Sequence, residues 1–268
     1  MNNSDKLYGY EDNITTSMGA WFPGERVVYR GKDLFTELAD EPWMRLLLYG
    51  ITGKIFNDNQ VKLFESIWVI STSYPDPRLW NNRVAALAGT ARSSSGLGIG
   101  SAITISEASI YGMRPIIAIS DFLIKAQENK NNGGDLREFI NKTKQERKII
   151  PGYGRPIVNV DERIEPLKRT AKALGFDRGI YFRLAFEIES ILKEQNISIN
   201  MNVASAFAGL TADQGLSSRE HYYFMTLCFT AGMFPCMIDT FNKPEGTFLP
   251  IRCDRIVYEG QEEKRAWV

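Results

Sequence analysis

The sequence predicts a mostly α-helical protein, and three observations support this. Apolar residues recur at helical spacing through most of the 268 residues. Strict alternation of apolar and polar residues, which is typical of half-buried strands, is nearly absent. The hydrophobic content of 44% and the charged content of 24% are ordinary for a globular protein with a substantial core. About ten or more helices fit this pattern.

The first helices are expected between Lys32 and Ile70, where apolar residues fall into three groups at helical spacing. The first group covers residues 34–38, and the breaks lie at residues 40–42 and 53–58. Two prolines in SYPDPRLW then force an extended break, because proline disfavours the helical backbone just before it. Further helices are expected at residues 81–91, 116–127, 134–148, 163–174, 181–195 and 217–241.

The run GTARSSSGLGIGSAITISEASIYG, residues 89–112, has almost no large side chains. Such a composition allows two helices to approach closely, or a backbone to approach a ligand. Gly98 and Gly100 superficially suggest a dinucleotide fingerprint, but the third glycine and the preceding strand are missing. Close helix packing is therefore the preferred interpretation.

Charge and cysteine content narrow the class of protein. The 32 basic and 32 acidic side chains cancel, so no overall field attracts nucleic acid or an anionic membrane, and neither partner is expected. No apolar stretch reaches the roughly 20 residues of a membrane span. Residues 1–25 are read as a tail without a targeting segment. Cys228, Cys236 and Cys253 are odd in number and favour reduced thiols in a cytoplasmic protein.

His221 is the only histidine, which excludes mechanisms and zinc sites that need several histidines in one chain. No metal is expected. The residue lies on the first turn of a helix that begins at a Ser217 or Ser218 cap, with Glu220 close to the capping-box position. A surface or capping role is preferred over catalysis, because the helix dipole there disfavours the imidazolium.

A glycine-rich turn with two arginines stands out at PGYGRPIVNVDER, residues 151–163. The backbone N–H groups of such a turn can cradle an anion, while Arg155 and Arg163 can grip a carboxylate or phosphate. The alternative is that both arginines make surface ion pairs of little energetic weight. The residues alone leave both interpretations open, with these carboxylates as the possible partners: Asp161, Glu162 and Glu165.

Five motifs in order resemble the citrate synthase superfamily: YRGKDLFTEL, VISTSYPDP, PGYGRPIVNVDER, NMNVASAFAGL and LCFTAGMFPCMID. The second stands at the family's T-x-D-H-G turn, the third matches PGxGH followed by D-x-R, and the fourth matches the N-V-D segment. The similarity covers nearly everything from Val28 to Tyr258. It is greatest to the compact citryl-CoA lyase form, which also makes up the C-terminal part of ATP-citrate lyase.

The resemblance implies an all-α fold with a large and a small helical domain, in a homodimer or a higher homo-oligomer. On this basis residues 1–25 form the tail, 26–150 with 235–268 the large domain, and 151–234 the small domain. Family members close over a CoA thioester and an organic acid. A carboxylate moves the α-proton of the thioester while two histidines stabilise the enolate and polarise the ketone.

The residues that carry this chemistry in the family are replaced here. The first histidine falls at Ser73 or Tyr74, the second at Arg155, and the aspartate at Ala204. Ala204 has no titratable group, and Arg155 stays protonated, so neither can act as the base. Arg155 can still donate hydrogen bonds to a carbonyl. The resemblance places the turn residues Gly152, Tyr153 and Gly154 against the CoA thioester.

The anion-binding arginines of the family are only partly kept. Arg163 matches the arginine that follows the glycine turn, whereas Phe229 replaces the arginine of G-R-x-x-G. A later arginine aligns with Pro250, and Arg252 lies two positions on. Phe229 would turn part of a carboxylate site into an apolar wall, so citrate or oxaloacetate should bind poorly.

Two functions follow from this pattern. The first is an enzyme with altered chemistry on a CoA thioester or related acyl substrate, with Arg155 and Arg163 as donors and Tyr74 or Ser73 as a proton relay. The second is a catalytically inactive paralogue that serves as a structural or regulatory partner of another protein in a hetero-oligomer. The preserved glycine turn favours the first, and the loss of the base and both histidines favours the second.

Overall fold

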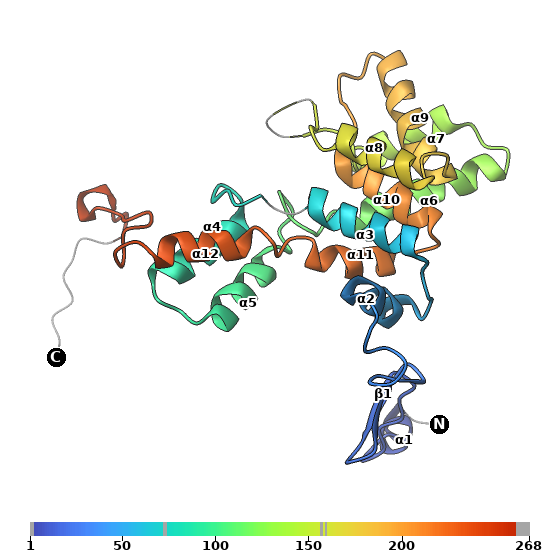
Figure 1. Ribbon diagram of the computed structural model, residues 1–268. Helices are drawn as coiled ribbons and strands as arrows, with labels where there is room; N and C mark the ends of the chain where they lie inside the picture. The colour runs from blue at the N-terminus through green and yellow to red at the C-terminus, as the bar shows by residue number, and fades with distance from the viewer. Residues whose placement is uncertain (1–2, 72–73, 156–157, 159, 261–268) are drawn as a thin grey trace. The chain divides into compact units, whose positions relative to one another are not determined.

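The computed structural model describes every residue except 1–2, 72–73, 156–157, 159 and 261–268. The described chain divides into two compact units (Figure 1). The first unit comprises residues 1–71 and 113–228, and the second unit comprises residues 72–112 and 229–268. The large and small domains implied by the family resemblance have other boundaries, and that division remains a prediction. Twelve α-helices occur in the described residues, which confirms the all-α prediction.

The N-terminal part contains a short helix and a small sheet that the sequence analysis did not anticipate. Helix α1 covers Asn3–Tyr8. Strands β1 (Gly19–Phe22), β2 (Arg26–Tyr29) and β3 (Lys32–Asp33) pair antiparallel in the order β1-β2-β3. The register places Val28 of β2 between Ala20 of β1 and Asp33 of β3. These strands are too short to give a clear alternating pattern.

The helix expected at residues 34–38 is wrong, because turns follow β3 instead. The carboxylate of Asp33 accepts hydrogen bonds from the backbone N–H groups of Phe35 and Thr36 at 2.9 and 3.0 Å. Those two backbone bonds lower the pKa of Asp33 below its ordinary value. Aspartate thus supplies a local alternative to the helix, and this outweighs the apolar spacing.

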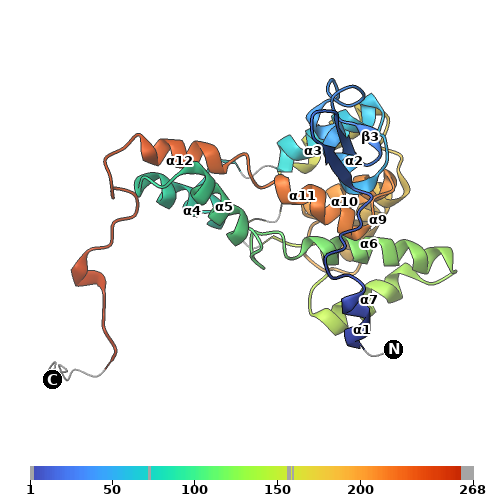
Figure 2. The same ribbon diagram turned by 90° about the horizontal axis from the view of Figure 1, so that it is seen from below.

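The core of the first unit is built around a helix that is buried over nearly its whole length, α10 (Val203–Asp213). Its small residues admit close neighbours: a Cβ at Gly209 would lie 2.9 Å from the backbone of Phe182. Figure 2 shows α10 among α6, α9 and α11. The other helices of the unit are α2 (Trp43–Thr52), α3 (Asp58–Ser71), α6 (Ile116–Asn131), α7 (Leu136–Arg147), α8 (Ile164–Leu174), α9 (Ile180–Glu194) and α11 (Ser218–Leu227).

The long helix expected at residues 217–241 is two helices, α11 and α12 (Met233–Phe241). Its start is confirmed, since Ser217 and Glu220 form a capping box at the N-terminus of α11. The helix ends at Leu227, and α12 begins after Gly232, a residue type with poor helix propensity. The boundary between the two units, after Cys228, lies within this break.

The second unit packs α12 against α4 (Trp80–Thr90) and α5 (Ser95–Ile105), which lie together in Figures 1 and 2. A Cβ at Gly89 would collide with the carbonyl oxygen of Met237, and one at Gly98 would lie 2.7 Å from the Cβ of Ala88. The close packing expected from the small residues is confirmed. A short 3₁₀ helix, Cys253–Arg255, follows.

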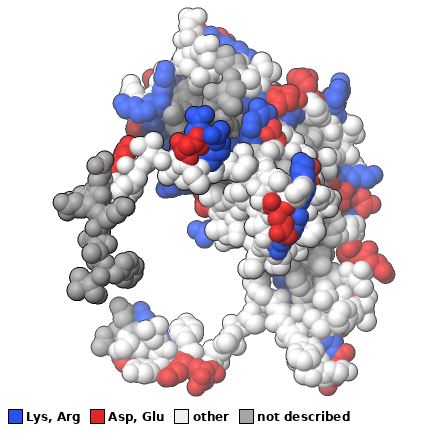
Figure 3. All heavy atoms as spheres, turned by 90° about the vertical axis from the view of Figure 1, so that its left-hand side faces the viewer, with Lys and Arg blue, Asp and Glu red and all other residues white. Residues whose placement is uncertain are grey.

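Basic and acidic side chains are mixed over the face shown in Figure 3, with broad uncharged areas between them. In the part of the chain that the structure describes, no helix combines the length and apolar character needed to cross a membrane. All three cysteines are free thiols, as expected: Cys228 and Cys236 are buried, whereas Cys253 is exposed.

Candidate functional site

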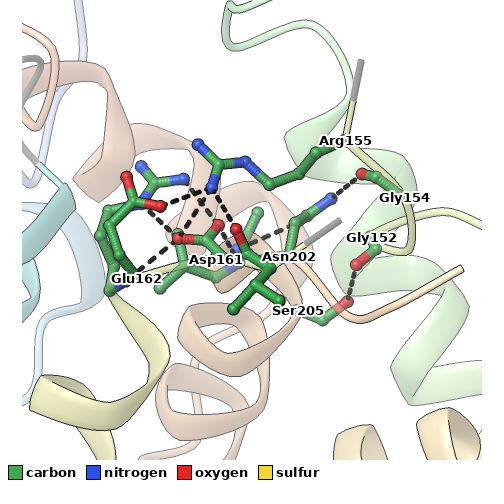
Figure 4. Close-up of polar contacts among 11 residues, drawn as sticks. Gly152, Gly154, Arg155, Asp161, Glu162, Asn202 and Ser205 are labelled. Carbon is green, nitrogen blue, oxygen red and sulfur yellow. Dashed lines mark hydrogen bonds and ion pairs between the residues drawn. The ribbon is translucent and has the colours of Figure 1, made fainter. Parts of the chain in front are cut away.

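The glycine turn at Pro151–Arg155 has a geometry that requires glycine. Gly152 and Gly154 have φ angles of +83° and +92°, in the region that side chains disfavour. A Cβ at Gly152 would also collide with the Oγ of Ser205 and lie 3.0 Å from Ile119 Cγ2. The Oγ of Ser205 instead donates a hydrogen bond to the Gly152 carbonyl at 3.0 Å (Figure 4). The first turn of α10 therefore fixes this part of the turn.

A second set of bonds joins the turn to the segment before α10. The Gly154 N–H donates to the Asn200 carbonyl at 2.7 Å, and the Asn202 N–H donates to the Gly152 carbonyl at 3.0 Å. The side-chain amide of Asn202 reaches the Gly154 carbonyl at 3.3 Å (Figure 4). Its Oδ1 also caps α10 by accepting the Ala204 N–H at 3.0 Å. One asparagine thus holds both the turn and the helix.

Tyr153, between the two glycines, is a core residue. Its hydroxyl donates to the Ala185 carbonyl at 2.7 Å, and its ring packs edge-on against Phe122. Burial raises the pKa of Tyr153 well above that of a free tyrosine. Its side chain therefore belongs to the core and anchors the turn to α9.

Asp161 is the centre of the charged cluster that follows the turn. Its side chain is buried, yet it accepts two hydrogen bonds from Arg163, from Nε and Nη2, both at 2.8 Å (Figure 4). It also accepts the Val203 N–H at 2.9 Å. Burial alone would raise the pKa of Asp161, but Arg163, the Val203 N–H and the charge of Arg155 lower it below its ordinary value. The group stays ionised.

Arg155 lies near Asp161 and pairs with a more exposed carboxylate, Glu162. Its Nη1 donates to Glu162 Oε2 at 2.7 Å and to the Val160 carbonyl at 2.9 Å (Figure 4). The Asp161 carboxylate lies 3.8 Å from the same nitrogen. The hydrogen bond from Arg155 is the main reason that the pKa of Glu162 is lowered. Both arginines are therefore held by carboxylates that follow the turn, but the pair of Arg163 with Asp161 is buried, unlike the surface pairs of the ion-pair interpretation.

Ala204 lies at the start of α10, one residue from Ser205, and is half-buried. Ala204 is a candidate from the sequence, whereas Asn202, Ser205 and the central role of Asp161 emerge only from the structure. A detectable signal existed for Asn202, since asparagine directly before an apolar helical run is typical of an N-cap. The burial of Asp161 depends on contacts distant in sequence.

The remaining candidates belong to the second unit, apart from Ser73, which lies outside the described residues. The Tyr74 side chain is exposed, and its carbonyl accepts the Asn82 side-chain amide at 2.6 Å. The Phe229 ring packs against the apolar core of the second unit, and its carbonyl accepts the Asn81 amide at 3.0 Å. The adjacent buried residues Asn81 and Asn82 thus fix the backbone at Phe229 and at Tyr74.

Arg252 is exposed and pairs with Asp254, two residues on, at 2.8 Å. Of the candidates, the structure brings together Gly152, Tyr153, Gly154, Arg155, Arg163 and Ala204, all in the first unit. Among the described residues, no group of three or more histidine, cysteine, aspartate or glutamate side chains is arranged to hold a metal ion.

The prediction of a surface role for His221 is wrong. The side chain is 1% exposed, and its Nδ1 lies 2.8 Å from the hydroxyl of Thr211 on α10. Burial lowers the pKa of His221 to about 3, so the ring is neutral at physiological pH. The capping box fixes the helix start, but the packing of α11 against α10 decides which face is buried.

Comparison with known proteins gives the class to which this fold and turn belong. The family described as citrate synthase, C-terminal domain, matches residues 17–225. This match spans most of the chain, and the protein belongs to that family. No curated protein sequence matches it.

Solved structures show the same fold. Citryl-CoA lyase from Hydrogenobacter thermophilus superposes with a TM-score of 0.79 at 16% identity, over 95% of this chain and 97% of that one. ATP citrate lyase from Methanothrix soehngenii, in complex with citrate and coenzyme A, gives 0.74 at 19% identity, over 98% of this chain and 45% of that one. Citrate synthase from Thermotoga maritima gives 0.61 at 17% identity, over 84% and 59%.

Proposed function

We propose that this protein binds a CoA thioester or a related acyl compound at the turn Pro151–Arg155, and forms or cleaves a carbon–carbon bond with altered catalytic residues. The observation that carries the proposal is the fit between Gly152 and Ser205. The turn admits only glycine at Gly152 and is tied to α10 by several hydrogen bonds, so its backbone is fixed and a ligand can approach it closely. The resemblance to the family is what assigns Arg155 and Ala204 to the catalytic positions beside this turn.

Arg155 is the group proposed to contact the reacting part of the ligand. Its guanidinium is a permanent cation, so it donates hydrogen bonds to a carboxylate, a thioester carbonyl or an enolate without exchanging a proton. The Glu162 carboxylate forms an ion pair with Arg155 at 2.7 Å. Because Glu162 is exposed, an incoming anion would replace it. Asp161 and Arg163 hold each other through a pair of hydrogen bonds and position the segment after the turn.

Proton transfer needs another group in this scheme, because the Ala204 side chain has no titratable group. Tyr74 or Ser73 is proposed as the relay, and Phe229 and Arg252 are proposed as substrate-binding residues, all as the resemblance suggests. The exposed Tyr74 hydroxyl is of the right chemical type. No activity as an ordinary citrate synthase or citryl-CoA lyase is expected, since both require a base for the α-proton.

A catalytically inactive paralogue is the second candidate, and a specific observation favours it. Arg155 and Arg163 are both paired with carboxylates of the segment that follows the turn, Asp161 and Glu162. Such an arrangement stabilises the turn without any ligand. In this case the protein would act as a structural or regulatory partner of another family member, in a hetero-oligomer.

We also propose that the protein forms a homodimer or a higher homo-oligomer through the segment 89–112 and its neighbours. The adjacent helices α5 and α12 of the second unit carry large apolar side chains in solvent: Leu97, Ile105, Phe234 and Ile238. Clusters of this kind on a single chain are typical of interaction surfaces.

The proposed function is tested by incubating the purified protein with acyl-CoA compounds, each with and without a keto acid, and following free CoA release and thioester consumption. Crystals soaked in the same compounds would locate any bound ligand. Turnover with any acyl-CoA, together with ligand density at the turn, supports the enzyme. Binding without turnover, or neither, favours the inactive paralogue.

A further inference from the structure

A hollow of about 500 Å³ lies between α8 and α9 of the first unit, and it shares no residue with the glycine turn. Pockets for small molecules commonly measure about 300–1,000 Å³, so the hollow is of suitable size. Helix α8 contributes Lys168, Arg169 and Lys172, and α9 contributes Arg183. Both helices are drawn in yellow to orange in Figure 1.

The basic side chains of the hollow are only partly neutralised. Lys168 pairs with Glu165 at 2.8 Å, and Asp177 is the other acidic residue of the lining. Four basic residues therefore face two acidic ones. The structure gives the side chains of three of them no ion pair or hydrogen bond with the residues it describes: Arg169, Lys172 and Arg183. A concave surface with excess positive charge attracts anions.

The wall of the hollow is fixed rather than loose. The carboxylate of Asp213 accepts the N–H groups of Tyr181 and Phe182 at 2.9 Å each, which caps α9. Gly179 permits this approach, because a Cβ there would collide with Asp213. The rings of Phe182 and Phe186 pack edge-on, with centroids 5.1 Å apart, and line the hollow. These contacts fix the backbone that carries Arg183.

We infer that this hollow binds the diphosphate group of a small molecule. Two arginines and a lysine supply the planar forks and the point charge that suit phosphate oxygens. A diphosphate carries more charge than a single carboxylate, and so it matches a lining with several unpaired cations. The diphosphate could belong to a nucleotide or to a CoA compound, and titrations with ADP and with CoA distinguish these sources.

Calorimetry of the full chain with sodium pyrophosphate, ADP and CoA tests the inference. The double substitution Arg169→Gln/Arg183→Gln removes both guanidinium groups from exposed positions, so the fold should persist, as circular dichroism would verify. We expect wild type to bind pyrophosphate with a Kd below about 1 mM, and the double variant to bind about tenfold more weakly or worse. The matched control is Arg178→Gln, an exposed arginine of the same chain segment outside the lining, which should change the Kd less than about twofold.

Three results would overturn the inference. The first is no measurable binding of pyrophosphate, ADP or CoA by wild type. The second is equal binding by wild type and the double variant, or an equal loss in Arg178→Gln, which would indicate diffuse attraction. The third is loss of pyrophosphate binding in Arg155→Ala, because that would place the anion at the glycine turn.

Discussion

Gly152 and Ser205 lie so close that a Cβ on the glycine would collide with the serine Oγ, which donates to the Gly152 carbonyl at 3.0 Å. This contact joins the glycine turn to α10, and Asn202 adds two more bonds between the same segments. The turn and the N-terminus of α10 therefore behave as one structural element.

Gly152→Ala should lower the free energy of unfolding by about 2 kcal/mol or more, since it adds a collision to a strained φ angle. Gly154→Ala is the matched control. It has a similar φ of +92°, but the nearest atom would lie 3.9 Å from its Cβ, so it should cost only about 1 kcal/mol. Urea unfolding measures both values. Equal losses in the two variants would contradict the close contact.

Asp161→Asn should destabilise the protein by about 2–4 kcal/mol at neutral pH, because it leaves Arg163 without its buried partner. The folded pKa of Asp161 is depressed, so its stabilising contribution is present above the unfolded value of about 3.9. That contribution is lost as pH falls through the lower folded pKa. Thermal unfolding of both proteins from pH 7 to pH 2 should show the difference shrinking at the acid end. A difference that stays constant or grows toward acid pH would contradict the assignment.

Leu97→Asp should disrupt self-association, because it places a charge on the exposed apolar surface of α5. Light scattering at micromolar concentration should give wild type a mass of at least twice the 30.4 kDa of one chain, and the variant a lower one. Leu7→Asp replaces an equally exposed leucine of α1 and should leave the mass unchanged. A wild-type protein that is a stable monomer would refute the proposed dimer.

Most of the helices could be predicted from apolar spacing, because a helix that buries one face leaves a periodic pattern. The spacing was misleading at residues 34–38, where Asp33 bonds the following N–H groups, and it missed the break before Gly232. The strands at Gly19–Asp33 were missed because each is too short to show alternation. Local signals compete at such places, and packing decides between them.

The candidate site was predictable in part. The glycine turn and the paired arginines are local in sequence, and both arginines pair with carboxylates of the same segment. The contacts that organise them are not local: Asp161 reaches Val203, and Ser205 reaches Gly152. The burial of His221 was misjudged for the same reason, since one sequence does not tell which helix covers which face.

Glu162→Gln should strengthen ligand binding at the turn by several fold. Glu162 pairs with Arg155 at 2.7 Å, and a ligand anion must replace it. Removing the charge lowers this competition and leaves the exposed position otherwise unchanged. Glu194→Gln, which removes a similarly exposed carboxylate that is paired with another arginine, is the control. If both variants bind like wild type, Glu162 does not compete with the ligand.

The central claim is that Arg155 contacts a bound anion, and calorimetry with a panel of acyl-CoA compounds and organic acids tests it most directly. We expect wild type to bind at least one compound and Arg155→Ala to bind it about tenfold more weakly, while folding is nearly unchanged. Arg137→Ala removes another arginine paired with a glutamate and should bind like wild type. If Arg155→Ala binds the same compound as tightly as wild type, the claim is contradicted and the inactive paralogue is favoured.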